Sequence, residues 1–258
     1  MSPLATIAWR AVGALFVLFL LTPLVLVVLF SFSSSGMANF PIEAWSLRWW
    51  QTMLNHRAFP GALRNSLLIG GVVGVISAIA GTMAAMGLSR LPARRASAAM
   101  AALCLPLMLP PLVLAVALLS FYVGIGLRLS LLTVILSHLL FTLPFVVLVV
   151  YARMRTFDDR VVESARDLGA SPMRAFVTVT LPIIRPTVIG AALIAVALSV
   201  DDFVITFFTI GGGNTLPTFV WGMIRTALTP AANAIGTLIL GMTVGSTLLA
   251  LWLTRYRG

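Results

Sequence analysis

Residues 163–182 read ESARDLGASPMRAFVTVTLP, a charged stretch in a chain whose other long segments are almost free of charge. The chain of 258 residues is 60% hydrophobic and 9% charged, which is too apolar for a soluble domain of this length. On both sides of the stretch, apolar runs of about 20 residues are long enough to cross the hydrocarbon core of a bilayer as helices. The stretch therefore predicts a polar loop between two spans of a polytopic membrane protein.

This polar loop carries its own helix signals. Asp158 and Asp159 stand where a helix would begin, because carboxylates are favoured at the positive end of a helix. Gly169 is placed to end that helix, and Ser171 with Pro172 forms an N-cap followed by a proline at the first helical position. The loop is predicted to fold into two short helices about a glycine.

The second of these helices is expected to end at the Leu181-Pro182 pair. From the residues alone, the folded loop can dock on another protein or lie on the lipid headgroups, and both interpretations stay open. A DNA-binding helix-turn-helix is disfavoured, because both ends of the loop are held within a short reach of the bilayer.

Six stretches have the length and composition of membrane-spanning helices. They are Ala11 to Phe32, Asn65 to Ser89, Ala96 to Ile125, Leu129 to Ala152, Thr187 to Ile210 and Ala231 to Thr254. Continuous apolar runs predict helices and not the alternating strands of a membrane barrel. The expected fold class is an all-α membrane protein with six transmembrane helices in one domain, residues 1–258, with a polar loop at residues 156–184.

The placement of arginine predicts the orientation. The chain has 17 basic residues and no lysine, so every one of them is arginine. With six spans, twelve arginines, among them Arg10, Arg257 and those of the polar loop, fall on one side, and five fall on the other. The rule that basic residues stay inside places both termini in the cytoplasm. The net charge of +10 thus reflects topology, and nucleic acid is not expected as a partner.

A pair of carboxylates lies inside the fifth predicted span. Asp201 and Asp202 would each cost about 2.5 to 3.5 kcal/mol at the bilayer centre, so they are expected to face the protein interior. In one interpretation they attract a cationic substrate, with Phe203, Phe207 and Trp221 offering aromatic faces to its ammonium groups. In the other, the pair caps or pins a break in the span. Since adjacent helical residues diverge by about 100°, at most one carboxylate is expected to face a pathway.

Three further segments bear on the architecture. The prolines of LPLMLPP, residues 105–111, must bend or break the third span, which favours a channel or transporter over a plain anchor. The spacing of Gly70 with Gly74 and of Gly241 with Gly245 lets helices approach closely. In the outer loop, SLRWWQTMLNH, residues 46–56, is expected to form a short interfacial helix.

The chain lacks the residues of a nucleotide-hydrolysing or metal site. A P-loop needs a lysine on the phosphates, and this sequence contains none. His56 and His138 stand apart from other ligands, and the single Cys104 lies in an apolar run. For His138 a hydrogen bond between helices is favoured over a proton relay. We therefore expect no enzyme activity, no cofactor and no metal in this chain.

The spacing of the polar loop resembles the EAA loop of binding-protein-dependent ABC transporter permeases. Glu163-Ser164-Ala165 is followed after three residues by Gly169 and, nine residues later, by VTLP, whereas the family signature reads E-A-A, three residues, G, nine residues, I, any residue, L-P. The chain departs from it with Ser164 for alanine and Val179 for isoleucine. The resemblance implies a coupling helix that sits in a cleft of a cytoplasmic ATPase. The docking residues that it implies are Glu163, Ser164, Ala165, Asp167, Gly169, Ala170, Ser171 and Pro172.

Other segments look like the spermidine/putrescine branch of that family, specifically the second of its two paired permeases. They are NSLLIG from Asn65, LPLMLPPLVLAVAL from Leu105 and SVDDFVITFFTIGGGNTLP from Ser199. The resemblance implies the MetI-like permease fold of type I ABC importers, in the bacterial inner membrane, with a polyamine or a similar small cationic solute as substrate. It also implies a homologous second permease, two copies of a cytoplasmic ABC ATPase that binds ATP and Mg, and a periplasmic substrate-binding protein.

On the residues alone, two other classes of function stay open. An ion-gradient-driven secondary transporter would use Asp201 or Asp202 as its proton site. A membrane scaffold would transport nothing, and it is weakened by the prolines of LPLMLPP and by the carboxylate pair.

Overall fold

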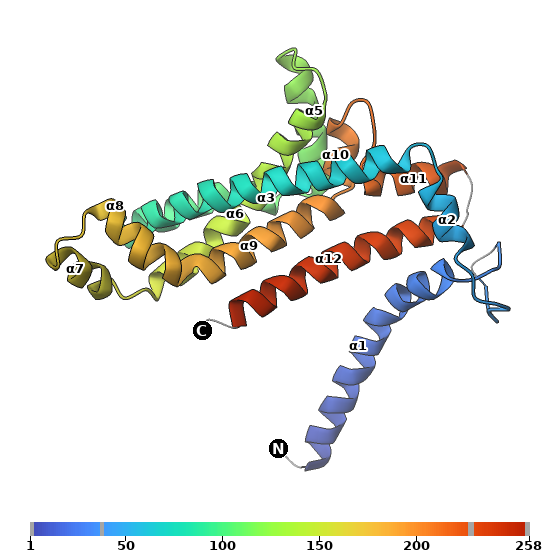
Figure 1. The fold of residues 1–258 in the computed structure, drawn as a ribbon, viewed down its shortest axis with the longest axis horizontal. Helices are drawn as coiled ribbons and strands as arrows, with labels where there is room; N and C mark the ends of the chain where they lie inside the picture. The colour runs from blue at the N-terminus through green and yellow to red at the C-terminus, as the bar shows by residue number, and fades with distance from the viewer. Residues whose placement is uncertain (1–2, 37–38, 227–229, 256–258) are drawn as a thin grey trace. The chain divides into compact units, whose positions relative to one another are not determined.

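The computed structural model describes residues 3–36, 39–226 and 230–255 (Figure 1). Within these ranges nearly all regular structure is helical, and strand-like pairing is limited to a lone bridge between Ser33 and Trp45. The expectation of an all-α chain is confirmed, while the prediction for Arg257 falls outside the described residues. The helices are α1 (Pro3–Ser31), α2 (Arg48–Leu54), α3 (Phe59–Ser89), α4 (Ala93–Met108), α5 (Pro111–Gly124), α6 (Leu131–Arg155), α7 (Arg160–Asp167), α8 (Pro172–Ala175), the π-helical η1 (Phe176–Thr180), α9 (Leu181–Asp201), α10 (Val204–Thr209), α11 (Leu216–Thr226) and α12 (Ala231–Arg255).

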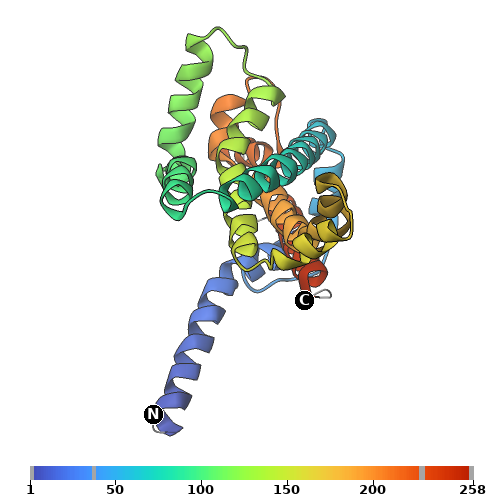
Figure 2. The same cartoon turned by 90° about the vertical axis from the view of Figure 1, so that its left-hand side faces the viewer.

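Among the described residues, five helices are long and apolar enough to cross a membrane. They cover Thr6–Ser31, Phe59–Ser89, Leu131–Arg155, Pro172–Asp201 and Ala231–Leu253. Helices α4 and α5 make a sixth span if the bent pair is counted as one, and the angle between them is 95°. Figure 2 shows α4 nearly end-on beside an upright α5.

The bend between α4 and α5 follows from consecutive prolines. Leu109, which precedes Pro110, leaves the helix in an extended conformation with φ −81° and ψ 140°. Pro111 then occupies the first position of α5, where its missing N–H costs nothing. The predicted single span at residues 96–125 is therefore two helices, and the prediction that its prolines bend or break it is confirmed.

At Pro182 the helix continues, so the helix end predicted there is wrong. Helix α8 runs through η1 into α9 without a gap. A proline inside an α-helix lacks a donor and its ring collides with the preceding turn. The π-helical turn, with its wider i to i+5 bonding, ends at Thr180, two residues before Pro182, in the turn that the ring would otherwise meet.

The fifth predicted span, residues 187–210, is interrupted near its C-terminal end. Helix α9 ends at Asp201, the backbone is extended at Asp202 with φ −67° and ψ 121°, and α10 follows. After α10 the chain turns at Gly211, whose φ is +69°. A Cβ at Gly211 would lie 2.5 Å from the Leu129 carbonyl oxygen, so only glycine fits between the two loops.

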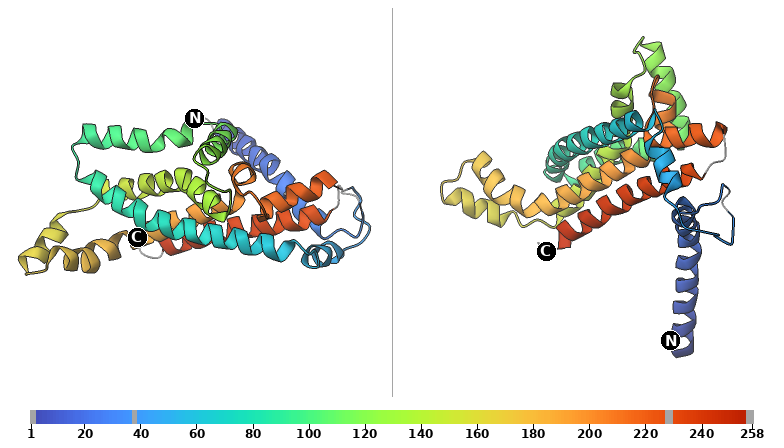
Figure 3. Two further views of the ribbon diagram at one scale, coloured as in Figure 1. Left: turned by 90° about the horizontal axis from the view of Figure 1, so that it is seen from above. Right: turned by 45° about the vertical axis from the view of Figure 1, so that its right-hand side comes forward.

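The chain divides into two compact units. The larger unit, residues 61–218 and 241–258, has a core where α3, α6 and α9 pack together. The buried side chains of this core are Ala85, Leu88, Val146, Val147, Val150, Ala191 and Ala195. Helices α7 and α8 lie at one end of these three helices, and α10 lies toward the other (Figures 1 and 3).

Two glycines bring α3 against α9. A Cβ at Gly70 would lie 2.7 Å from Val200 Cγ2, and one at Gly74 would collide with Val196. The close approach predicted for this pair is confirmed. At Gly241 and Gly245 on α12, a Cβ would meet no atom within 4 Å.

The smaller unit, residues 1–60 and 219–240, contains α1 and α2. Helix α2 forms within SLRWWQTMLNH as predicted, with Trp49 and Met53 buried. The ring of Phe32 stacks on Trp50 with centroids 5.5 Å apart. These aromatic contacts hold α2 against the end of α1.

Candidate functional site

The polar loop after α6 folds into the two short helices that its sequence predicts. At the start of α7, Asp158 Oδ1 accepts a hydrogen bond from the Arg160 amide at 3.1 Å. The chain reverses at Gly169, whose φ of +88° lies in the region that side chains rarely adopt. Ser171 Oγ accepts from the Arg174 amide at 3.3 Å and caps α8.

An open hollow of about 470 Å³ lies at this bend. Besides Arg166, it is lined by six of the eight residues that the EAA-like spacing singles out, namely Glu163, Asp167, Gly169, Ala170, Ser171 and Pro172. Leu168 is 90% exposed and Met173 is 70% exposed, so apolar side chains stand beside the polar hollow. Sequence reasoning missed these two, although both are lone apolar residues in a polar loop. The arrangement suits docking by another protein.

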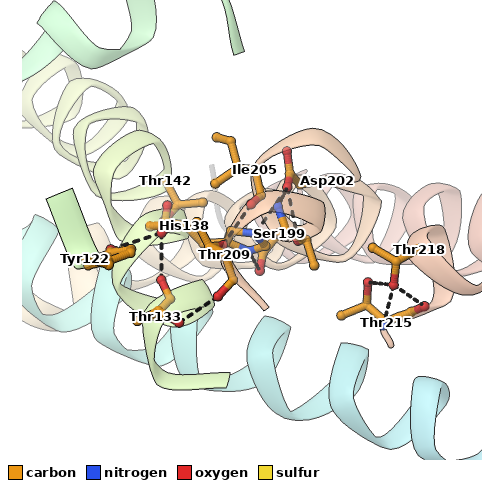
Figure 4. Close-up of polar contacts among 12 residues, drawn as sticks. Tyr122, Thr133, His138, Thr142, Ser199, Asp202, Ile205, Thr209, Thr215 and Thr218 are labelled. Atoms are coloured by element: carbon orange, nitrogen blue, oxygen red, sulfur yellow. Dashed lines mark hydrogen bonds and ion pairs between the residues drawn. The ribbon is translucent and has the colours of Figure 1, made fainter. Parts of the chain in front are cut away.

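A buried polar cluster inside the larger unit centres on His138 (Figure 4). Its Nδ1 lies 2.7 Å from Ser199 Oγ on α9, and its Nε2 lies 2.9 Å from Thr206 Oγ1 on α10. The side chain, on α6, is only 1% exposed. The predicted role of His138 in a hydrogen bond between helices is confirmed.

Asp202 occupies the break between α9 and α10 and is held by the same cluster. Its Oδ2 accepts hydrogen bonds from the Thr206 amide at 2.8 Å and from the Thr206 hydroxyl at 3.1 Å. The same oxygen lies 3.3 Å from His138 Nε2. A carboxylate in apolar surroundings needs such partners, because it has lost those that water would supply. Asp202 thus matches the interpretation in which the acidic pair pins a break.

Further hydroxyl groups extend the cluster along α6. The pairs are Ser77 with Thr142 at 2.9 Å, Tyr122 with Ser137 at 3.0 Å, and the Thr133 hydroxyl donating to the Thr209 carbonyl at 2.7 Å. Sequence reasoning missed them, although polar residues recur at helical spacing along α6. In the described part of the chain, no three His, Cys, Asp or Glu side chains gather closely enough to hold a metal ion.

Asp201, the neighbour of Asp202, is exposed. The ring centroids of Phe203 and Phe207 lie 5.5 Å apart, and Phe207 is 44% exposed. Phe208 meets Phe207 edge-on at 5.5 Å. Three residues that were predicted to line a pathway therefore lie close to the break at Asp202. They are Asp201, Phe203 and Phe207. Trp221, on α11, belongs to the smaller unit and is 41% exposed.

Comparison with known sequences gives one family and several relatives. The family model described as binding-protein-dependent transport system inner membrane component matches residues 70–257. The chain is 36% identical over 248 residues to the putrescine transport system permease protein PotI of Escherichia coli K12, covering 93% of this chain and 88% of that protein. It is 30% identical over 225 residues to the spermidine/putrescine transport system permease protein PotC of the same organism, covering 86% and 84%.

Two solved structures share the fold. A chain of a bacterial ABC transporter involved in the import of the acidic polysaccharide alginate aligns with a TM-score of 0.70 at 17% identity, covering 98% of this chain and 95% of that one. A chain of the MetNI methionine ABC transporter aligns with a TM-score of 0.63 at 20% identity, covering 78% and 96%. This likeness confirms the predicted MetI-like fold of type I importer permeases.

Proposed function

This chain belongs to the family of binding-protein-dependent transport system inner membrane components and is a permease subunit of an ABC importer, and we propose that it forms half of a pathway for polyamines. Putrescine, spermidine or a similar small cationic solute is the proposed substrate. The observation that carries the proposal is the family match over residues 70–257, together with relatives whose names specify putrescine and spermidine transport.

The residues at the break between α9 and α10 support a cationic substrate. Asp201 is exposed, and Phe207 beside it is partly exposed. A carboxylate attracts an ammonium group, and an aromatic face stabilises it by about 0.5 to 2 kcal/mol, depending on how far it is desolvated. In the proposed function Asp201, Phe203 and Phe207 contact the substrate, and Asp202 holds the backbone in place.

The α7–α8 loop is the proposed coupling site. Its hollow gathers most of the residues of the EAA-like spacing, and Leu168 and Met173 project beside it. A chain without lysine cannot build a P-loop, so ATP and Mg would bind to a separate ATPase subunit. Two copies of that ATPase, a homologous second permease and a periplasmic substrate-binding protein would complete the importer. Both termini would lie in the cytoplasm.

A substitution at Gly169 tests the coupling proposal. Valine is strained at the φ of +88°, whereas asparagine adopts this region more readily, so the Gly169→Asn variant is the matched control. We expect Gly169→Val to lose copurification of the ATPase subunit and ATP-dependent putrescine uptake, and Gly169→Asn to keep most of both. A Cβ at this position meets no atom within 4 Å, so the valine side chain displaces no neighbour and the strain is confined to the backbone of the loop.

Two results would contradict the proposal. If Gly169→Val kept the ATPase bound, the loop would not be the coupling site. If the chain alone took up putrescine into vesicles without ATP, a transporter driven by an ion gradient would be favoured instead.

A further inference from the structure

A single imidazole bridges the two sides of the break in the fifth span. Ser199, which bonds to His138 Nδ1, lies on α9 before the break (Figure 4). Thr206, which bonds to Nε2, lies on α10 after it. His138 itself belongs to α6, a helix that packs against both α9 and α10. Each ring nitrogen therefore holds one half of the broken helix to the same third helix.

The backbone at the break does not fix this geometry by itself. Asp202 has extended dihedral angles, so the helical bonding that sets the direction of α9 stops there. What joins the two halves is a set of side-chain bonds: His138 to both sides, and Asp202 Oδ2 to the amide and hydroxyl of Thr206. A neutral imidazole fits this set, because Nε2–H can donate toward Thr206 Oγ1 while Nδ1 accepts from the Ser199 hydroxyl.

Because of these bonds, the two adjacent carboxylates have different surroundings. Asp202, with its side chain 14% exposed, turns toward His138, whereas Asp201 is exposed. A rotation of α10 about the break would carry Thr206 away from His138 Nε2 and from Asp202 Oδ2. The bonds from His138 and Asp202 oppose that rotation, because it would leave buried polar groups without partners.

We infer that His138 is a positioning residue that bridges the break between α9 and α10, holds Asp202 inward and thereby presents Asp201, Phe203 and Phe207 to the substrate. The inference rests on the proposed function for the substrate, but its structural part stands on the contacts of His138 alone. It assigns the two acids separate roles, with Asp201 in the pathway and Asp202 in the bridge.

The first experiment measures the break directly. Hydrogen exchange followed by mass spectrometry is compared between the unsubstituted full-length chain in lipid nanodiscs and its His138→Leu variant. Leucine fills the site but bonds to neither side, so amide exchange in residues 203–210 should rise about tenfold or more, as expected for the loss of two buried hydrogen bonds. The Thr206 amide, which donates to Asp202, is the most informative position.

The matched control is Thr142→Val. Thr142 is buried, polar and on the same helix, one turn from His138, but its hydroxyl bonds to Ser77 on α3 and to the His138 carbonyl. Exchange in residues 203–210 should change less than about twofold in this variant, because no bond to α9 or α10 is lost. Equal exchange in His138→Leu and the unsubstituted chain, or an equal rise in both variants, would overturn the bridge.

A second measurement distinguishes a positioning role of His138 from a role in assembly of the transporter complex. In proteoliposomes with the assembled complex, His138→Leu should lower radiolabelled putrescine uptake about tenfold while ATP hydrolysis changes less than about twofold. His138→Gln, which can still reach Thr206 and Asp202, should recover part of the uptake. If uptake and hydrolysis fell together, His138 would serve assembly only, and the positioning role would be wrong. If the unsubstituted complex took up no putrescine, the proposed substrate would fail, and the exchange experiment would still decide the bridge.

Discussion

Asp201 and Asp202 are neighbours in sequence but have different surroundings. Replacing Asp202 by asparagine keeps an acceptor for the Thr206 amide, yet it brings an NH2 group into a cluster that needs an acceptor for two donors. We expect Asp202→Asn to lower the free energy of unfolding by about 1 to 3 kcal/mol, measured as a fall in the thermal midpoint of the purified protein. Asp201→Asn should leave that midpoint nearly unchanged and lower putrescine uptake about tenfold.

The conservative variant Asp201→Glu is the control, because it keeps the negative charge. It should transport better than Asp201→Asn at equal expression. Loss of stability in Asp201→Asn, together with loss of uptake at unchanged stability in Asp202→Asn, would reverse the two roles.

The sequence predicted that Asp201 and Asp202 have different roles, but it did not predict which residue has which role. In a continuous helix the angle of about 100° between adjacent residues would let at most one carboxylate of the pair face a pathway, but Asp202 is extended in the structure. Which carboxylate is held in the polar cluster depends on His138, some 60 residues earlier in the chain, and on hydroxyl partners that local patterns do not connect to it. Lone histidines predict a hydrogen bond between helices, but the identity of the partners is a tertiary property.

Gly74 and Gly71 lie three residues apart on α3 but have different neighbours. Gly74 on α3 lies directly against Val196 of α9, whereas a Cβ at Gly71 would meet nothing within 4 Å. Gly74→Ala should cost about 1 to 3 kcal/mol of stability, because α3 and α9 must separate. Gly71→Ala should stabilise the protein by about 0.5 to 1 kcal/mol, since alanine is the better helix former.

Thermal midpoints of the two variants in the same detergent or nanodisc check this prediction. A midpoint for Gly74→Ala at or above that of Gly71→Ala would show that α3 and α9 do not approach at these glycines.

The sequence predicted which segments form helices better than it predicted where those helices end. Long apolar runs predict helices, and consecutive prolines after Leu109 predict a broken one, since the physical causes are local. The end predicted at Leu181-Pro182 fails because a π-helical turn absorbs the proline. The sequence left a break at the acidic pair as one of two interpretations, because the partners of Asp202 include His138 on α6, which a local pattern does not connect to it. Tertiary bonding thus decides where the fifth span stops.

At the scale of the whole molecule, much apolar surface stays open. The window that identifies α1 as a span has no buried residue, and that of α12 is 17% buried, while those of α3, α6 and α9 are 39 to 50% buried. In a membrane, lipid or another subunit covers such helices, so exposure here does not oppose folding. Composition predicts this condition, because a chain that is 60% hydrophobic has more apolar residues than its own core can hold.

The orientation of the chain can be tested by labelling single cysteines. Twelve of the 17 arginines lie on the side that carries the α7–α8 loop in the six-span arrangement, which predicts that this loop faces the cytoplasm. In a Cys104→Ser background, Met173→Cys reports on the loop and Ile125→Cys on the end of α5. Both positions are well exposed, at 70% and 59%.

A membrane-impermeant maleimide applied to intact spheroplasts should label Ile125→Cys and leave Met173→Cys unlabelled until the membrane is permeabilised. The Cys104→Ser parent, without any thiol, measures background labelling. Labelling of Met173→Cys in intact spheroplasts would place α7 and α8 outside the cell, where no ATP-hydrolysing subunit could reach them. The coupling proposal would then fail together with the orientation, whereas the helix contacts around His138 would be unaffected, because they lie within the larger unit whichever way it faces.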